Sequence, residues 1–240
     1  MKKLIAYITT GYPDKNFTVD LIYSLKENGV DGIELGLPFS DPVADGPIIQ
    51  EVNKRALEKG YKIQDTFYVT EQIAKNLDTY WMGYFNNFYH KGYDFMTQKA
   101  EEYGVKGFII PDLPYEEAVI YEDKFPLISF VAPTDSKERI KQILKNPKEF
   151  IYMVAYAGIT GAEKQEDLSE IIKTIKEITD TPLYIGFGVN EKTAREKSQG
   201  VDGVIVGSAF VKVLLEDISN SEKIKKISSI AKIIKEEINI

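Results

Sequence analysis

Two carboxylates in the stretch GIELGLPFSDPVADGP, residues 32–47, stand where acid/base chemistry is possible. Glu34 lies between Ile33 and Leu35, in an apolar run with the length and composition of a buried strand. Burial raises the pKa of a carboxyl group and lets it donate or accept a proton near neutral pH. Asp45 follows in a loop broken by proline and glycine, which leaves two interpretations open, a turn residue or a second acting carboxylate.

The sequence lacks the residues that several other catalytic mechanisms require. The chain has no cysteine, which excludes thiolate nucleophiles, zinc–thiolate sites and disulfides, and its single histidine, His90, excludes a multi-histidine metal site. No GxSxG, Walker or GxGxxG motif occurs. Lys3 and Lys106 lie at or before strand starts, whereas a Schiff-base lysine would act near a strand end. Carboxylates, tyrosines and oriented backbone groups remain.

Eight short apolar runs alternate with longer amphipathic stretches along the 240 residues. They cover residues 4–9, 32–36, 80–85, 107–110, 126–132, 150–155, 182–188 and 203–207. Near-continuous apolar runs are typical of parallel strands covered on both faces, and eight of them alternating with helices predict a (β/α)8 TIM barrel. No linker or composition break interrupts the pattern, so we expect a single domain over residues 1–240. A stripe of isoleucines near the C-terminus, at 224, 227, 230 and 234, predicts a helix that packs on this barrel, with a partner-facing helix as the alternative.

The barrel fixes the direction of Glu34. If Ile33 and Leu35 face the helix layer, Glu34 points inward, near the carboxyl end of its strand, where such barrels have their active sites. A buried ion pair is the alternative, but no basic residue stands at the carboxyl end of any predicted strand. For Asp41 and Asp112 two interpretations remain open, a role in a turn or a functional role.

Glycine-bearing segments follow three late strands, at residues 157–163, 186–191 and 207–212. Glycine lets the backbone approach a ligand, and a helix that begins there offers free amides to an anion. Barrels often bind phosphate between the loops after strands seven and eight. The residues alone therefore predict a metal-free, phosphate-binding barrel that uses carboxylate acid/base chemistry.

The net charge and the distribution of apolar residues limit the possible binding partners and the cellular location of the protein. A net charge of −7 disfavours a nucleic-acid interface, which needs a basic face. The N-terminal apolar run is too short for a signal peptide, and no run of about eighteen apolar residues predicts a membrane span. We expect a cytoplasmic protein without nucleic-acid or membrane partners.

The stretch ELGLPFSDPVADGP closely resembles the signature of the tryptophan synthase alpha subunit, itself a (β/α)8 family. The resemblance extends along nearly the whole chain through AYITTGYPD, GYFN, IIPDLPYEE, GITGAE, GFGV and GVIVGSAFVK. It implies a lyase of tryptophan biosynthesis that cleaves indole-3-glycerol phosphate, in a retro-aldol reaction, to indole and glyceraldehyde 3-phosphate.

Carried over by position, the resemblance implies that Glu34 is the general acid/base and that Asp45 faces the indole ring nitrogen. Protonation of the ring carbon C3 creates an electron sink inside the substrate, so no Schiff-base lysine is required. The resemblance also implies two sets of substrate-binding residues. The phosphate and lower pocket would consist of Thr160, Gly161, Gly186, Phe187, Gly188, Gly207 and Ser208. The indole pocket would consist of Tyr7, Tyr84 and Tyr152.

Members of this family form an alpha2-beta2 heterotetramer with a beta subunit that carries pyridoxal phosphate and receives indole through a tunnel. The resemblance places Pro38, Asp41 and Asn86 at that interface, so Asp41 is interpreted as a loop or interface residue, and no cofactor is expected in this chain. Ala155 and Tyr156 stand where relatives commonly have serine and arginine, which bears on the polar contacts of the sixth loop.

Three functional hypotheses follow. The first is a lyase acting in a complex with the beta subunit. The second is a stand-alone lyase that releases free indole and has lost the interface. The third is a weakly active barrel that mainly activates its partner, against which the retained Glu34 and Asp45 argue.

Overall fold

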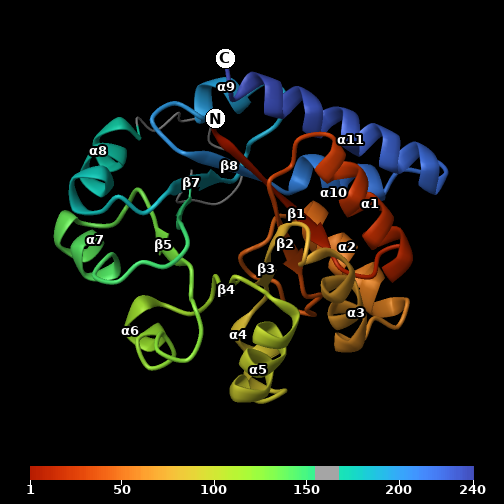
Figure 1. Cartoon of the computed structure of the whole chain (residues 1–240), viewed down its shortest axis with the longest axis horizontal. Coiled ribbons are helices and arrows are strands. Elements are labelled where there is room, and N and C mark those ends of the chain that lie inside the picture. Colours follow the sequence, from red (N-terminus) through yellow and green to blue (C-terminus); the bar gives the residue numbers. More distant parts are fainter. Residues whose placement is uncertain (155–167) are drawn as a thin grey trace.

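The computed structural model describes residues 1–154 and 168–240, and eight parallel strands run through them (Figure 1). These are β1 (Lys3–Thr9), β2 (Gly32–Gly36), β3 (Asp78–Met82), β4 (Gly107–Ile109), β5 (Ser129–Val131), β6 (Ile151–Val154), β7 (Leu183–Gly186) and β8 (Gly203–Val206). Each lies in or overlaps one of the eight predicted apolar runs. The predicted (β/α)8 barrel is confirmed.

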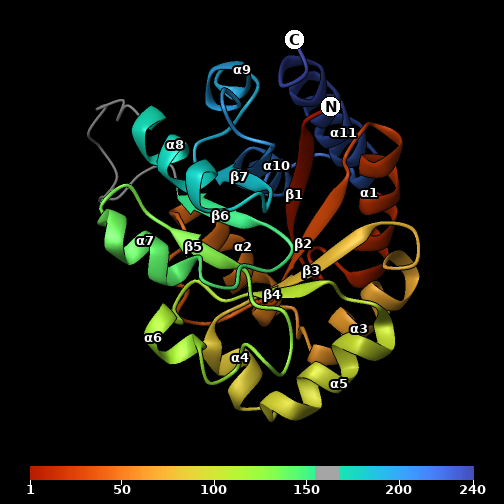
Figure 2. The same cartoon turned by 60° about the vertical axis from the view of Figure 1, so that its left-hand side comes forward.

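The helices lie outside the strands, as the turned view makes plain (Figure 2). They are α1 (Lys15–Glu27), α2 (Pro47–Glu58), α3 (Ile63–Ile73), α4 (Phe85–Tyr89), α5 (Tyr93–Tyr103), α6 (Tyr115–Ala118), α7 (Lys137–Ile143), α8 (Ser169–Ile178), α9 (Ala194–Lys197), α10 (Ser208–Leu214) and α11 (Asn220–Glu237). Within the described ranges, none of them combines the length and the apolar character needed to cross a lipid bilayer.

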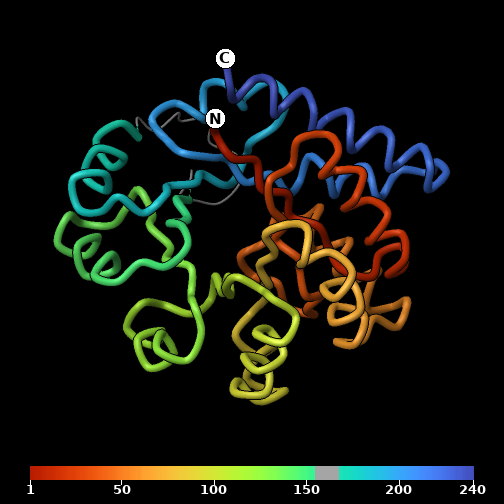
Figure 3. The backbone as a smooth tube through the Cα atoms, viewed as in Figure 1, coloured from red at the N-terminus to blue at the C-terminus, as the bar shows by residue number. Residues whose placement is uncertain are grey.

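The C-terminal isoleucine stripe packs on the barrel, as predicted. Ile227 and Ile234 of α11 are fully buried, and α11 lies beside α1. The backbone trace brings the two ends of the chain to the same side of the molecule (Figure 3). There the backbone N–H of Lys2 donates to Oδ1 of Asn239 at 2.8 Å.

The strands pair in the order β4-β3-β2-β1-β8-β7-β6-β5. The two end strands of this row, β4 and β5, meet through one residue, Phe108. Its N–H donates to the Pro126 carbonyl at 2.9 Å, and its carbonyl accepts from the N–H of Ile128 at 3.0 Å. Every other pair of neighbouring strands has at least two registered residue pairs, so the contact between β4 and β5 is the narrowest seam of the barrel.

One strand differs from its prediction. The apolar run at 80–85 predicted a strand there, whereas β3 covers Asp78–Met82. Tyr84 instead serves as the N-terminal cap of the short helix α4, whose Asn87 side chain accepts from the Tyr84 N–H at 2.9 Å. The apolar run at 80–85 therefore contains both the end of β3 and the start of α4, which apolar character alone does not distinguish.

Aromatic side chains fill the amino-terminal end of the barrel interior. Phe150, 1% exposed, meets Tyr80 edge-to-face at 5.1 Å between ring centroids and stacks on Tyr184 at 4.7 Å. Ile5 and Ile205 belong to the same interior cluster. This end of the barrel is thus a packed core, which leaves the carboxyl end for function.

Replacing Phe150 by alanine is expected to lower the free energy of unfolding by about 3–5 kcal/mol, because it removes a buried ring that two aromatic neighbours cannot replace. Urea denaturation followed by circular dichroism measures the change. Tyr89→Ala, at a side chain 64% exposed, is the control and should stay within about 0.5 kcal/mol of the parent. A loss below about 1 kcal/mol in the Phe150 variant would show that the cluster does not hold the barrel closed.

Candidate active site

Glu34 lies at the centre of β2, on the inner face of the barrel. In the ladders it is paired with Tyr7 of β1 and Tyr80 of β3, and Tyr80 belongs to the barrel interior. Directly paired residues on neighbouring strands project to the same face, so Glu34 projects inward. Ile33 and Leu35 pack in the helix-facing core. The direction predicted from alternation is confirmed.

The Glu34 carboxyl group is buried without a cation. The residue is 2% exposed, Oε1 has no hydrogen-bond partner, and no ion pair involves it within the described residues. Burial, followed by the nearby Asp45 charge, raises its pKa from 4.5 to about 8. The ion-pair alternative therefore fails for the described part of the chain, and Glu34 carries a proton at neutral pH.

Asp45 reaches the same region from the loop between β2 and α2. Pro47 begins α2 with Gly46 as its cap, so the Asp-Gly-Pro sequence is a helix start as well as a turn. The Tyr84 hydroxyl accepts from the Ala44 N–H at 2.9 Å and donates to Oδ2 of Asp45 at 3.0 Å. One hydroxyl thereby fixes two consecutive loop residues against the end of β3.

The two carboxyl groups have different pKa values because their surroundings differ. Partial burial raises the pKa of Asp45 from 3.8 to about 6, and the hydrogen bond from Tyr84 opposes that rise. Asp45 is therefore largely ionised at neutral pH while Glu34 is largely protonated. A proton-carrying acid next to a negative charge is the arrangement that acid/base chemistry on a cationic intermediate requires.

Replacing Tyr84 by phenylalanine is expected to raise the pKa of Asp45 by about one unit, since it removes a hydrogen bond to the charged form. Carbon-13 NMR titration of the Asp45 carboxyl measures this shift. Tyr89→Phe, which removes the hydroxyl of an exposed side chain in α4, the helix that Tyr84 caps, should leave the Asp45 pKa unchanged. An equal Asp45 pKa in parent and Tyr84→Phe would show that the hydroxyl does not hold the carboxylate.

Tyr7 and Tyr152 flank the carboxyl groups, and two glycines make room for them. A Cβ on Gly36 would lie 2.5 Å from the Tyr7 hydroxyl, and a Cβ on Gly186 would lie 2.3 Å from the Tyr152 hydroxyl. Burial raises the pKa of both phenols well above their usual value, and Glu34 and Asp45 add to the rise. Both tyrosines are therefore neutral, and they present apolar rings beside the carboxylates.

The predicted phosphate residues of the last two strands follow β7 and β8. Gly186 ends β7, and Phe187 and Gly188 come next with φ angles of +72° and +69°. Gly207 follows β8 as the cap of α10, which Ser208 begins. Thr160, Gly161, Ala155 and Tyr156 lie outside the described residues. Because β7 pairs with β8, the described residues of this set lie at or directly after the ends of two neighbouring strands.

The predicted interface residues lie on the rim near α4. Asp41 and Asn86 are exposed, and the buried Pro38 accepts from the Asn87 side chain through its carbonyl at 3.4 Å. The same rim exposes apolar side chains, with Val43 80% and Tyr89 64% accessible. Asp112 has a local role, because its Oδ1 accepts from the Phe85 N–H at 2.8 Å at the start of α4.

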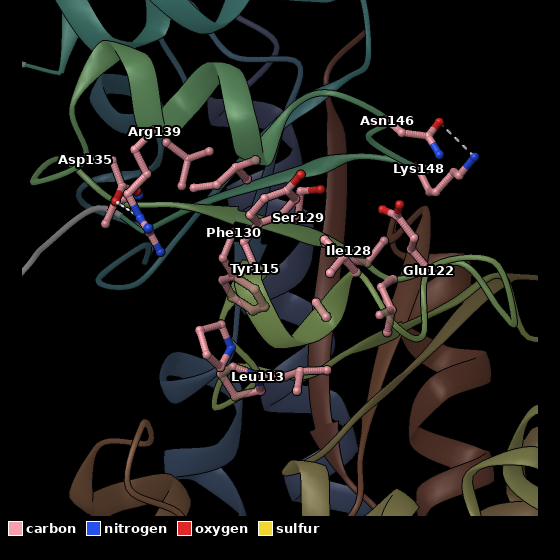
Figure 4. A pocket seen from close by; sticks show the side chains of 18 of the residues that line it. Leu113, Tyr115, Glu122, Ile128, Ser129, Phe130, Asp135, Arg139, Asn146 and Lys148 are labelled. Carbon is pink, nitrogen blue, oxygen red and sulfur yellow. Dashed lines mark hydrogen bonds and ion pairs between the residues drawn. The ribbon is translucent and has the colours of Figure 1, made fainter.

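A separate cavity of about 220 Å³ opens between α6, α7 and β5 (Figure 4). Ile128, Phe130 and Tyr115 line it, and none of the predicted site residues in the described ranges does. Phe130 also stacks on Tyr152 at 4.8 Å between centroids. The cavity therefore adjoins Tyr152 through the Phe130 ring, but it lies outside the site that contains Glu34 and Asp45.

Several polar residues near the site were not predicted from the sequence. Thr9 donates to the Tyr7 hydroxyl at 3.4 Å, and Thr193 and Lys197 donate to carbonyls of the loop after β7. Alternation along AYIT would have placed Thr9 on the face of Tyr7, whereas nothing in the sequence marks Thr193 or Lys197. Within residues 1–154 and 168–240, no three potential metal ligands of the His, Cys, Asp or Glu type cluster together.

Comparisons with known proteins agree with one another along the chain. A family model described as "Tryptophan synthase alpha chain" matches residues 1–239. A tryptophan synthase alpha chain from Wolinella succinogenes is 53% identical over 246 residues, covering 100% of this chain and 96% of the relative. A tryptophan synthase structure from Mycobacterium tuberculosis has a TM-score of 0.88 at 32% identity, covering 100% of this chain and 93% of that one. Tryptophan synthase subunit alpha from Campylobacter jejuni has a TM-score of 0.85 at 32% identity, covering 95% of each chain.

Proposed function

The chain belongs to the tryptophan synthase alpha chain family, which performs the alpha reaction of tryptophan biosynthesis, and we propose that Glu34 and Asp45 carry this reaction out. The protein is an enzyme subunit of the lyase class. Its reaction, in the proposed form, is the retro-aldol cleavage of indole-3-glycerol phosphate to indole and D-glyceraldehyde 3-phosphate. This makes the chain a carbon–carbon lyase, an indole-3-glycerol phosphate aldolase.

One observation carries the assignment of the acting groups. Glu34 is a buried, inward-facing carboxyl with an unpartnered oxygen and no cation, next to a second carboxylate of lower pKa. Burying such a group costs stability unless a ligand or a proton compensates it. A residue kept in this state inside a barrel, close to a loop carboxylate that follows the end of the same strand, is placed for function rather than for packing.

The proposed step uses the proton on Glu34. Transfer of that proton to ring carbon C3 of the indole leaves a cationic ring, which accepts the electrons of the breaking carbon–carbon bond. The Glu34 carboxylate then takes the proton from the side-chain hydroxyl, which becomes the aldehyde oxygen of the sugar phosphate. Protons balance, because C3 gains one and the hydroxyl loses one, and Glu34 ends as it began.

Asp45 is proposed to act through its charge. While C3 carries the added proton, positive charge develops at the ring nitrogen, and an ionised carboxylate held in place stabilises it. The Tyr84 hydroxyl supports this role, since its bond to Oδ2 favours the ionised form and fixes the loop. Tyr7, Tyr84 and Tyr152 are proposed to line the indole pocket beside it.

The phosphate is proposed to lie across the mouth, against the loops after β7 and β8. Gly186, Phe187, Gly188, Gly207 and Ser208 would contribute from the described loops. Thr160 and Gly161, outside the described residues, remain proposed members of the same pocket. The support is that the β7 loop has two successive left-handed residues next to a helix start after β8.

The partner is proposed to be a tryptophan synthase beta subunit, in an alpha2-beta2 assembly. Pro38, Asp41 and Asn86 are the proposed contact residues, and the exposed Val43 and Tyr89 on the same rim support an apolar interface there. Pyridoxal phosphate would belong to the beta subunit, with no cofactor in this chain.

A steady-state assay on indole-3-glycerol phosphate, with and without a beta subunit, tests the proposal. The purified chain should release indole by itself and should turn over faster as the beta subunit is titrated in. Absence of indole release in both conditions would contradict the proposed lyase. Indole release that the beta subunit neither accelerates nor captures would indicate the stand-alone lyase instead.

A further inference from the structure

The loop after β7 is held from outside the barrel by two side chains near α9. The Lys197 ammonium donates to the Phe187 carbonyl at 2.9 Å, and the Thr193 hydroxyl donates to the Gly188 carbonyl at 2.8 Å. The Asn190 N–H in turn donates to the Thr193 oxygen at 3.1 Å. Two consecutive carbonyls of the proposed phosphate loop are thereby captured by one short segment.

This capture restrains a backbone conformation that the residues themselves disfavour. Phe187 has a φ of +72°, in the left-handed region where a bulky side chain is a genuine outlier. Such a conformation persists only where the surroundings enforce it. The bonds from Lys197 and Thr193 act directly on these two peptide units, and the Phe187 ring also meets Tyr152 edge-to-face at 6.2 Å between centroids.

The captured carbonyls fix the direction of two amides. In a trans peptide unit the C=O and the following N–H point in opposite directions. The Phe187 carbonyl is aimed at Lys197 and the Gly188 carbonyl at Thr193, so the N–H groups of Gly188 and Val189 point away from these two side chains. Neither amide donates a hydrogen bond within the part of the chain that the structure describes. Successive amides that share a direction form a concavity suited to an anion.

We infer that Lys197 is a positioning residue for phosphate recognition, which holds the Phe187 carbonyl so that the Gly188 and Val189 amides face the sugar phosphate. This inference rests on the proposed function. Lys197 differs from the predicted phosphate residues, because it lies in α9 and not in the loop after β7. It acts on the phosphate only through its hydrogen bond to that loop.

The charge of Lys197 adds to this effect. Its side chain is partly buried, and burial lowers its pKa while the nearby Glu196 charge opposes that change. A Cβ on Gly188 would lie 2.9 Å from its nitrogen, so the ammonium rests directly against the loop backbone. A cation there raises the local potential on which a phosphate dianion depends.

Steady-state kinetics of Lys197→Met test the inference. The variant keeps the length of the side chain and removes its donors and charge. It should raise KM for indole-3-glycerol phosphate about tenfold, the order expected for one charge-assisted hydrogen bond, and leave kcat within about twofold. With the dephosphorylated substrate indole-3-glycerol, parent and variant should have equal kcat/KM. Lys197→Arg, which restores charge and donors, should bring KM back to within about threefold of the parent.

Control variants separate this effect from charge and from folding. Lys192→Met removes an exposed lysine from the same segment and should leave both kinetic constants unchanged. Thr193→Val releases the Gly188 carbonyl and the Asn190 N–H, leaves the Lys197 bond in place, and should raise KM in the same direction. The inference is overturned if Lys197→Met leaves KM unchanged, if it lowers kcat/KM equally for both substrates, or if arginine fails to restore KM.

Direct binding distinguishes this inference from the proposed function. Nitrogen-15 NMR should show the Gly188 and Val189 amide resonances of the parent shifting with inorganic phosphate, and about tenfold weaker binding in Lys197→Met. If the parent binds phosphate in this way but releases no indole, the proposed lyase fails and the positioning role stands. If the parent is an active lyase whose two amides do not respond to phosphate, the positioning role fails alone.

Discussion

Glu34→Gln is expected to lower lyase turnover by a factor of about 10²–10⁴, the range that a positioned proton donor contributes. Glutamine has the size and shape of glutamate but holds no transferable proton, so C3 of the indole ring is left unprotonated. The inner position of the side chain is fixed by β2, and the substitution should leave phosphate binding intact. Steady-state release of indole measures the change, and retention of most of the activity would contradict the acid/base role.

The pH dependence of the parent supplies a second measurement of the same group. Asp45 must be ionised and Glu34 protonated, so kcat/KM should rise through a pH of about 6 and fall through a pH of about 8. Because the two carboxyls interact, these values belong to the pair as apparent pKa values. The descending limb should be absent from whatever residual activity Glu34→Gln retains.

Stability against pH tests the burial of Glu34 without any substrate. Its pKa is raised in the folded protein from 4.5 to about 8, so between these values the folded state keeps a proton that the unfolded chain has released. The stabilising contribution is complete below pH 4.5 and is lost as the pH rises through about 8. The free energy of unfolding should therefore decline less over this range in Glu34→Gln than in the parent. Parallel curves would show that the carboxyl is not buried as described.

Asp45→Asn is expected to lower kcat about 10²–10³-fold, since it removes the charge that stabilises the cationic ring in the transition state. Asparagine still offers an oxygen to the Tyr84 hydroxyl, so the loop should keep its place. For the same reason KM should rise only a few-fold. Steady-state kinetics on indole-3-glycerol phosphate separate the two constants.

Asp41→Asn is the matched control for this substitution. It makes the same chemical change in the same loop, four positions earlier, at an exposed side chain whose carboxyl accepts from Ser40. The isolated chain carrying it should keep the turnover of the parent. Equal turnover in Asp45→Asn and the parent would remove Asp45 from the mechanism. Equal losses in the two variants would point to the net charge of the loop.

The parts of the fold that depend on local pattern could be predicted from the sequence. The apolar residues on either side of Glu34 predicted that its side chain points into the barrel, because neighbouring side chains on a strand project to opposite faces. The isoleucine stripe of α11 gave its packed face for a similar reason. The predicted end of β3 was too late, since Gly83 directly follows the strand and the apolar residues Tyr84 and Phe85 beyond it belong to the start of α4.

The amino-acid sequence by itself determined the barrel, the inward carboxylate and the glycine-bearing loops, since each depends on residue type and on short-range periodicity. Only the tertiary structure decided which hydroxyl holds Asp45 and which side chains hold the loop after β7. Tyr84 lies 39 positions from Asp45, and Lys197 reaches Phe187 from a separate helix. The energies of such contacts depend on distance in space and on the exclusion of water, and so do the pKa values of about 6 and about 8. Spacing along the chain determines neither of these quantities.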